Sequence, residues 1–253
     1  MKPVLLLEGK LALVTGAARG IGRAIAVAYA NAGARVLISD LDETACSDTR
    51  AEVEAAGAQA WTFALDVSDA ESCRRLAARV EREIGDLQVL VNNAGLMIRE
   101  SVDSPRALEA ARRLMEVNYF GTLNMMHAFL PALRRTRGCV INIASGAALT
   151  GLHGCVGYSP SKGAVKMLTQ AMTADLGRNG IRVNAIAPGV IETAMTESTR
   201  NDPERLAGCL ARIPAGRLGR PQEIAGPAVF LASELASYVN GVTLPADGGK
   251  QAV

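Results

Sequence analysis

Short apolar runs alternate with amphipathic stretches along most of the chain. Runs of strand length occur at 11–16, 34–40, 58–67, 87–95, 139–145, 181–189 and 241–249. Between them, apolar residues recur at helical spacing at 21–33, 43–57, 69–85, 103–117 and 119–136, from residue 158 onward, and from about residue 222. The strand-like runs are apolar throughout, as in a sheet that is covered on both faces. The pattern therefore predicts an α/β fold with a parallel sheet and right-handed crossover helices.

The alternation runs through residues 1–253 without a linker or a shift in composition, which predicts a single domain. The longest stretch without a regular pattern, about 189–221, contains three prolines. A long irregular loop in a compact domain usually has a function of its own. We expect this one to be a lid over the substrate.

The composition is that of a globular protein: 49% of residues are apolar and 21% are charged. A net charge of +2, without a long basic face, gives no reason to expect a nucleic-acid partner. The five cysteines lack metal-ligand spacing and there are only two histidines, so we expect reduced thiols and no metal site. No apolar run is long enough to span a bilayer. These features predict a cytoplasmic protein without a membrane partner.

A glycine-rich stretch, TGAARGIG at 15–22, joins the first predicted strand to the first predicted helix. Its glycines at 16, 20 and 22 allow a sharp turn and let an anion approach the backbone. The following helix directs its free N–H groups at that anion. The spacing G-x3-G-x-G differs from the usual dinucleotide fingerprint. Its position between strand and helix nevertheless predicts a loop that binds a diphosphate.

Asp40 ends the second predicted strand, where a carboxylate can accept a hydrogen bond from a ribose 2′-hydroxyl. An Asp that only caps the next helix is the common alternative. Arg19, in the glycine-rich loop, could instead hold a 2′-phosphate. Because Asp40 would place like charge against that phosphate, we expect NAD as the cofactor, with NADP as the open alternative.

Tyr158 precedes Lys162 by four residues in the stretch YSPSK, so the two side chains share a face if a helix begins there. An exposed pair without a function is the simpler alternative. A neighbouring cation favours a phenolate, and we expect Lys162 to lower the pKa of Tyr158 from its ordinary value near ~10. Ser145, at the end of a predicted strand, could hydrogen-bond a substrate oxygen as charge develops on it. Together these groups suit proton transfer at an alcohol.

Six motifs, in this order along the chain, resemble the short-chain dehydrogenase/reductase family. They are TGAARGIG, NNAG at 92–95, Asn118, Ser145, YSPSK and PG at 188–189. The resemblance implies a three-layer, Rossmann-like, doubly wound sheet of about seven strands, a nicotinamide cofactor and a homotetramer. Pro160 departs from the family, which more often has a small residue there. Proline is tolerated in the first turn of a helix, so a helix should begin at or just after Tyr158.

The same resemblance implies roles for individual residues. The catalytic set is Asn118, Ser145, Tyr158 and Lys162, with Asn118 at a helix kink that holds a proton-relay water. The cofactor should be held by Gly16, Arg19, Gly20, Ile21, Gly22, Asp40, Leu41, Asp66, Val67, Asn93, Ala94, Gly95, Tyr158, Lys162, Pro188, Gly189, Ile191 and Thr193. Within this set, Asp66 and Val67 should meet the adenine, whereas Ile191 and Thr193 should meet the nicotinamide amide.

The region between Ser145 and Tyr158 is apolar and glycine-rich without acids, which suits a neutral, partly apolar alcohol or ketone. His153 and Cys155 are expected to be wall residues of the pocket. Arg200 and Arg205 leave an anionic substrate end open. We therefore expect an NAD-dependent oxidoreductase acting on a secondary alcohol or its ketone. The alternatives are an NADPH-dependent 3-oxoacyl reductase and a non-catalytic cofactor-sensing protein.

Overall fold

The computed structural model describes residues 5–253, and at its centre lies a parallel sheet of seven strands in the order β3-β2-β1-β4-β5-β6-β7. The strands are β1 Leu11–Thr15, β2 Arg35–Asp40, β3 Ala60–Ala64, β4 Val89–Asn92, β5 Cys139–Ile143, β6 Arg182–Pro188 and β7 Thr243–Ala246. The order reverses between β1 and β4, and in such sheets ligands bind beyond the carboxyl ends of the strands at that point. The doubly wound α/β fold predicted from the sequence is confirmed, with residues 1–4 of the chain outside the described residues.

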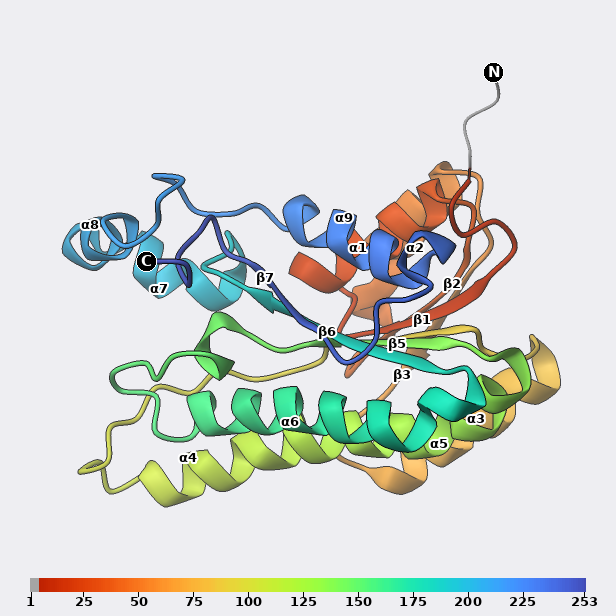
Figure 1. Ribbon diagram of the computed structural model, residues 1–253, viewed down its shortest axis with the longest axis horizontal. Helices are drawn as coiled ribbons and strands as arrows, with labels where there is room; N and C mark the ends of the chain where they lie inside the picture. The colour runs from red at the N-terminus through yellow and green to blue at the C-terminus, as the bar shows by residue number, and fades with distance from the viewer. Residues whose placement is uncertain (1–4) are drawn as a thin grey trace.

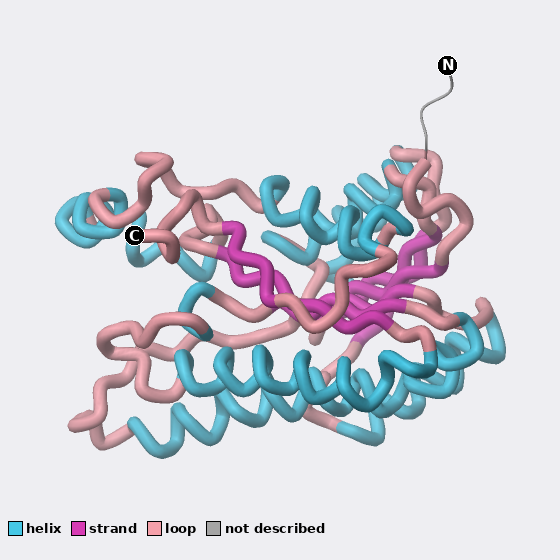
Figure 2. Tube along the Cα trace, viewed as in Figure 1, coloured by secondary structure: helices cyan, strands magenta, loops and turns pink. Residues whose placement is uncertain are grey.

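Helices cover both faces of the sheet and make three layers (Figures 1 and 2). One face carries α1 Gly20–Asn31, α2 Ser47–Ala55 and α9 Gln222–Ala232. The other carries α3 Ala70–Glu83, α4 Ala107–Leu114, α5 Gly121–Thr136 and α6 Tyr158–Leu176. Two short helices, α7 Glu197–Arg200 and α8 Pro203–Leu210, lie at one end of the molecule beside the C-terminus, at the left of Figure 1.

Alternate residues of each strand enter the two halves of the core, as a pleated strand requires. In β1, Ala12 and Val14 pack in the cluster that includes α1 and α9, whereas Leu11 and Leu13 pack in the cluster that includes α3 and α5. All four side chains are buried. Burial on both faces explains why the strands are apolar at every position rather than at every second one.

Helix α1 is fixed on the sheet by a stripe of apolar residues. Its buried residues are Gly22, Ile25, Ala26, Tyr29 and Ala30. Their spacing of three and four places them on one side of the helix. The Tyr29 hydroxyl also donates a hydrogen bond of 3.1 Å to the Ala228 carbonyl oxygen of α9. The amino end of α1 is therefore held rigidly at the carboxyl end of β1.

The segment 189–221 is more ordered than the sequence predicts, because it contains α7 and α8. Asp202 caps α8 by accepting a hydrogen bond of 3.0 Å from the Arg205 N–H, and Pro203 occupies its first turn. No residue of α8 is fully buried, and its apolar residues Leu206, Cys209 and Leu210 are only half-buried. The prediction of an irregular stretch was wrong at these two helices because they are short, four and eight residues, and lie in a segment with three prolines.

The helical segments predicted at 103–117 and 119–136 form one continuous run. A π-helical turn, Met115–Phe120, joins α4 to α5. Such turns often occur at functional sites, because they displace one residue from the regular helical ladder. Asn118 lies inside this turn, at the position where the sequence predicts a kink.

Candidate active site

A cavity of about 400 Å³ lies beyond the carboxyl ends of β4, β5 and β6. Ten residues assigned from the sequence line it: Ile21, Asn93, Gly95, Ser145, Tyr158, Lys162, Pro188, Gly189, Ile191 and Thr193. The fold thus gathers residues of five chain segments around one space. The other assigned residues are not in its lining: Gly16, Arg19, Gly20, Gly22, Asp40, Leu41, Asp66, Val67, Ala94 and Asn118.

Tyr158 is the first residue of α6, which places Pro160 in the first turn of the helix. The prediction that a helix begins at this tyrosine is confirmed. Tyr158 is buried and packs in a small apolar cluster with Leu114, Ala147 and Cys155. Cys155 thus lies behind the phenol and does not line the cavity. This packing holds the ring in place while the cavity leaves one side of it open.

Burial dominates the electrostatics of Tyr158 and Lys162. It raises the pKa of Tyr158, and of the protein's own groups it is Ser145 and Arg99 that act to lower it. Lys162 does not, so the predicted lowering of the Tyr158 pKa by Lys162 is corrected. The Lys162 ammonium donates a hydrogen bond of 2.8 Å to the Ile143 carbonyl oxygen, and burial lowers the pKa of Lys162 to about 8. The dry environment that disfavours a phenolate disfavours this cation too.

Asn118 is buried behind the cavity and is hydrogen-bonded to Leu96 and Ser161. Its Oδ1 accepts a hydrogen bond of 2.8 Å from the Leu96 N–H, and its Nδ2 donates to the Leu96 carbonyl oxygen at 3.0 Å. Nδ2 also donates to Ser161 Oγ at 2.9 Å. These bonds tie the loop after β4 to α6, so the side chain of Asn118 fixes the position of two cavity walls. Its predicted relay role stays a prediction.

The glycine-rich loop is tightly packed against the loop after β4. A Cβ at Gly16, where φ is 62°, would lie 2.8 Å from the Ala94 Cα, and one at Gly22 would collide with the Gly16 carbonyl oxygen. Asn93 Nδ2 donates to the Thr15 and Gly16 carbonyl oxygens, both at 2.9 Å. The first turn of α1 has no acidic residue, so its backbone N–H groups face an anion without competition. These features fit a dinucleotide diphosphate.

The segment after β6 approaches this loop from the opposite side. A Cβ at Gly20 would lie 3.4 Å from Thr193 Cγ2. Ile191 is buried and forms an isolated bridge with Gly219. The residues assigned to the nicotinamide amide are therefore within reach of the same ligand as the glycine-rich loop.

Asp40 lies at the end of β2 beside the glycine-rich loop. Its Oδ2 accepts a hydrogen bond of 3.0 Å from the Ala18 N–H, and its Oδ1 accepts one of 2.9 Å from the Leu41 N–H. Arg19, the next residue of the loop, is exposed and has no ion-pair partner among residues 5–253. The Leu41 side chain is 67% exposed. A carboxylate and a free guanidinium thus flank the place where the sequence puts the adenosine ribose.

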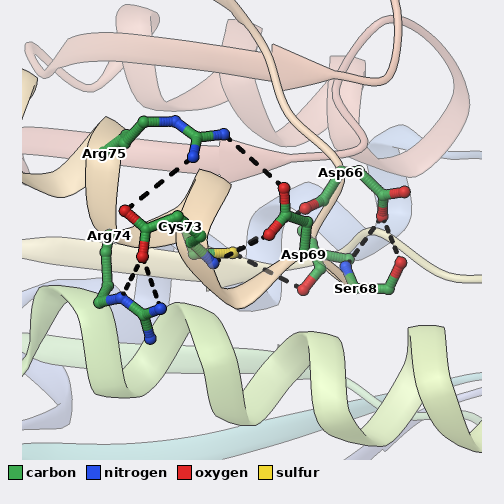
Figure 3. A network of polar contacts seen from close by, with 8 residues as sticks. Asp66, Ser68, Asp69, Cys73, Arg74 and Arg75 are labelled. Atoms are coloured by element: carbon green, nitrogen blue, oxygen red, sulfur yellow. Dashed lines mark hydrogen bonds and ion pairs between the residues drawn. The ribbon is translucent and has the colours of Figure 1, made fainter.

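Asp66 is oriented by the polar network shown in Figure 3. Its Oδ1 accepts hydrogen bonds from the Ser68 hydroxyl at 2.6 Å and the Ser68 N–H at 2.9 Å. The hydroxyl contact in particular lowers the pKa of Asp66, which stays ionised. Within the described part of the chain, its other oxygen makes no hydrogen bond. Val67 is buried, and its carbonyl oxygen accepts a hydrogen bond of 3.0 Å from Asn124. Contact of the two residues with adenine stays a prediction.

Four cations line the cavity in addition to Lys162: Arg99, Arg205, Arg212 and Lys250. Of these four, only Arg205 stood out from the sequence. The four are spread over 152 residue positions, and only the fold brings them together. The one local signal was the place of Arg99, four residues after the NNAG motif. His153 also lines the cavity, as expected of a wall residue.

Known proteins resemble this chain over almost its full length. A family model described as enoyl-(acyl carrier protein) reductase matches residues 16–251. A 3-oxoacyl-[acyl-carrier-protein] reductase of Vibrio cholerae is 39% identical over 246 residues, covering 96% of this chain and 98% of the relative. A gluconate 5-dehydrogenase of Gluconobacter oxydans is 37% identical over 251 residues, covering 96% and 95%.

The solved structures agree. A putative NAD(P)-dependent gluconate 5-dehydrogenase from Beutenbergia cavernae, crystallised with NADP, is 38% identical. It superposes with a TM-score of 0.94 over 99% of this chain and 100% of that one. The fold, the glycine-rich loop that fits a dinucleotide, and the similarity over almost the whole chain all indicate the same family. The chain belongs to the short-chain dehydrogenase/reductase family and is an NAD(P)-dependent oxidoreductase.

Proposed function

We propose that the protein oxidises a secondary alcohol, or reduces the matching ketone, with NAD as its cofactor and Tyr158 as the acid/base. The observation that supports this most strongly is the shared cavity. Ser145, Tyr158 and Lys162 line the same space as Gly95 and Thr193, which are assigned to the cofactor. When bound, the nicotinamide supplies the acceptor or donor of the hydride.

The protein's own groups perform the rest of the reaction. Tyr158 takes the proton of the substrate hydroxyl during oxidation and returns it during reduction. Ser145 donates a hydrogen bond to the same oxygen and stabilises the charge that develops on it. Lys162 offers buried N–H donors to ligand hydroxyls at the cavity wall. Asn118 positions these groups through its hydrogen bonds to Leu96 and Ser161.

A second candidate is reduction of 3-oxoacyl thioesters with NADPH. The Vibrio cholerae relative carries that name, and the free guanidinium of Arg19 favours a 2′-phosphate. Steady-state rates separate the candidates. A kcat/KM for a 3-oxoacyl thioester with NADPH that exceeds every value for small alcohols with NAD would replace the first proposal with the second. Cofactor binding without turnover across both substrate classes would indicate a cofactor-sensing protein.

Replacing Asp40 with asparagine is expected to lower the preference for NAD over NADP, measured as the ratio of kcat/KM values, by about tenfold or more. The substitution removes a negative charge that repels a 2′-phosphate, and tenfold corresponds to about 1.4 kcal/mol. Asparagine keeps an oxygen that can accept from the Ala18 N–H. The control is Asp42→Asn, an exposed carboxylate two residues further on that accepts hydrogen bonds from Thr44. A wild-type enzyme that already prefers NADPH would contradict the NAD assignment.

We propose that residues 189–221 form the substrate lid. Met195, Thr199 and Arg205 of this segment line the cavity, and α8 has no buried residue to anchor it. Such a helix can move at little cost in apolar contacts. Hydrogen exchange should show slower exchange in 194–210 when cofactor and substrate are both bound; unchanged exchange would remove the lid from the proposal.

We also propose that the protein assembles as a homotetramer. Met167 of α6 is 58% exposed, Phe230 of α9 is 37% exposed and Val242 is 37% exposed. Apolar side chains at such exposure are candidates for burial between copies of the chain. Light scattering should give a mass of roughly four times the 26.4 kDa of one chain, and a single-chain mass would count against the proposal.

A cytoplasmic location is part of the proposal. All five cysteines are free, which suits a reducing compartment. Among residues 5–253, no helix is both long enough and apolar enough to cross a bilayer. Cell fractionation followed by detection of the protein tests the location, and recovery outside the cytoplasmic fraction would refute it.

A further inference from the structure

The lining of the catalytic cavity is strongly cationic. Arg99 follows β4, Arg205 lies on α8, Arg212 follows α8, and Lys250 lies in the C-terminal turn. Of the described residues that line this cavity, none is an aspartate or a glutamate. The helices α7 and α8 and the C-terminus lie together at one end of the molecule (Figure 1), and the segment after β4 contributes Arg99 to the same cavity. A cavity with only positive charges attracts anions and disfavours cations.

Three of these four cations lack an ion-pair partner within the described residues. Over residues 5–253, Arg99, Arg212 and Lys250 have no carboxylate oxygen within ion-pair distance. Arg205 lies 3.7 Å from Asp202, and both side chains are largely exposed. Most of the positive charge around this cavity is therefore unpaired by carboxylates of the described residues. A bound anion would pair with this charge through charge-assisted hydrogen bonds.

The cationic region reaches the reacting group. Of the four cations, Arg99 is the one whose charge acts on the Tyr158 phenol. The cavity of about 400 Å³ also includes the residues assigned to nicotinamide, such as Gly95 and Ile191, so only part of it serves the substrate. An anionic group held by these cations would thus belong to a small molecule, only a few bonds from the carbon that reacts.

We propose that the substrate is a small hydroxy acid or keto acid whose carboxylate binds to Arg99, Arg212 and Lys250, with Arg205 closing on it from α8. This inference rests on the proposed function, because it places the carboxylate relative to an oxygen that Tyr158 serves. It narrows the neutral alcohol or ketone expected from the sequence to an anionic one. The acid-free stretch between Ser145 and Tyr158, on which the neutral expectation rests, forms only one wall of the cavity.

The test uses Arg212→Gln and Lys250→Gln. Arg99 is left unchanged, because its charge also acts on the Tyr158 phenol and a substitution there would affect the acid/base directly. The probes are D-gluconate and its uncharged amide, D-gluconamide, within a panel of other small hydroxy acids and their amides. Each substitution should lower kcat/KM for the acids by about tenfold, mostly through KM, because one charge-assisted hydrogen bond is lost. Values for the amides should change less than about threefold. The control is Arg178→Gln, an exposed arginine of the turn after α6 that does not line the cavity.

Calorimetric titration of the same acids and amides separates this inference from the proposed function. If acids bind more tightly than amides in wild type and lose that advantage in the Arg212→Gln/Lys250→Gln double variant, the carboxylate site is supported. If in that case no acid or amide is turned over, the proposed function falls while the carboxylate site stands. If the enzyme oxidises neutral alcohols through Tyr158 but binds acids no better than amides, the proposed function stands and the inference is overturned. Equal losses for acid and amide would also overturn it.

Discussion

Replacing Tyr158 with phenylalanine is expected to lower kcat for alcohol oxidation by about 10²- to 10⁴-fold, the usual contribution of a positioned acid/base. The substitution removes one hydroxyl and keeps the ring that packs against Leu114, Ala147 and Cys155. The fold and the cofactor affinity should therefore be retained. Steady-state assays give kcat, and a fluorescence titration with NADH gives the dissociation constant of the cofactor.

The pH dependence of this variant is a second readout. Burial raises the pKa of Tyr158, so the protein's own groups keep the phenol neutral through the neutral range. The wild-type rate of oxidation should then increase with pH, because the base form becomes more populated. The residual rate of the phenylalanine variant should lose that dependence. A variant that retains the wild-type rate and pH profile would remove Tyr158 from the mechanism.

Tyr29→Phe is the matched control, because it makes the same substitution at another buried tyrosine. The Tyr29 hydroxyl donates to the Ala228 carbonyl oxygen at 3.1 Å and lies away from the cavity. Its loss should cost about 1 kcal/mol of stability, as for one neutral hydrogen bond. Turnover should be unchanged. A similar loss of turnover in both variants would point to a structural rather than a chemical effect.

The fold could be predicted from the sequence because its signals are local. In β1, four consecutive apolar residues followed by Thr15 and Gly16 indicate a strand that is covered on both faces and ends at a turn. In α1, Ile25 and Tyr29 repeat at helical spacing. Helix α8 was missed because it is only eight residues long: Leu206 and Leu210 make a single helical repeat, which does not stand out in a segment that also contains Pro203 and Pro214.

The site was predictable in part for the same reason. The assigned residues Ser145, Tyr158 and Lys162 are marked by short motifs, and they do share a cavity. The cationic residues Arg212 and Lys250 belong to no motif. They line the same cavity only because of how the last 60 residues fold back over the sheet. The burial of Lys162 could not be predicted either, because a motif gives the identity of a side chain but not its distance from water.

Replacing Lys162 with methionine is expected to stabilise the protein while it lowers activity. Burial lowers the pKa of Lys162 from 10.5 to about 8, so holding the charged form at pH 7 costs about 3 kcal/mol. Methionine has a similar length and removes that cost. It also loses the hydrogen bond to the Ile143 carbonyl oxygen, worth about 1 kcal/mol. The free energy of unfolding should therefore rise by about 2 kcal/mol at pH 7, measured with urea.

The sign of the pH dependence makes this prediction specific. Below pH 8 lysine is protonated in both the folded and the unfolded state, so wild type bears the full cost of the buried charge. Between pH 8 and 10.5 the folded state loses its proton first, and the stability of wild type rises towards that of the variant. The advantage of Lys162→Met should thus be largest at neutral pH and shrink as pH approaches 10. Lys166→Met, one turn further along α6 and only half-buried, is the matched control for losing a lysine from this helix. A destabilised Lys162→Met at pH 7 would mean that the buried ammonium is stabilised by more than the one carbonyl it contacts.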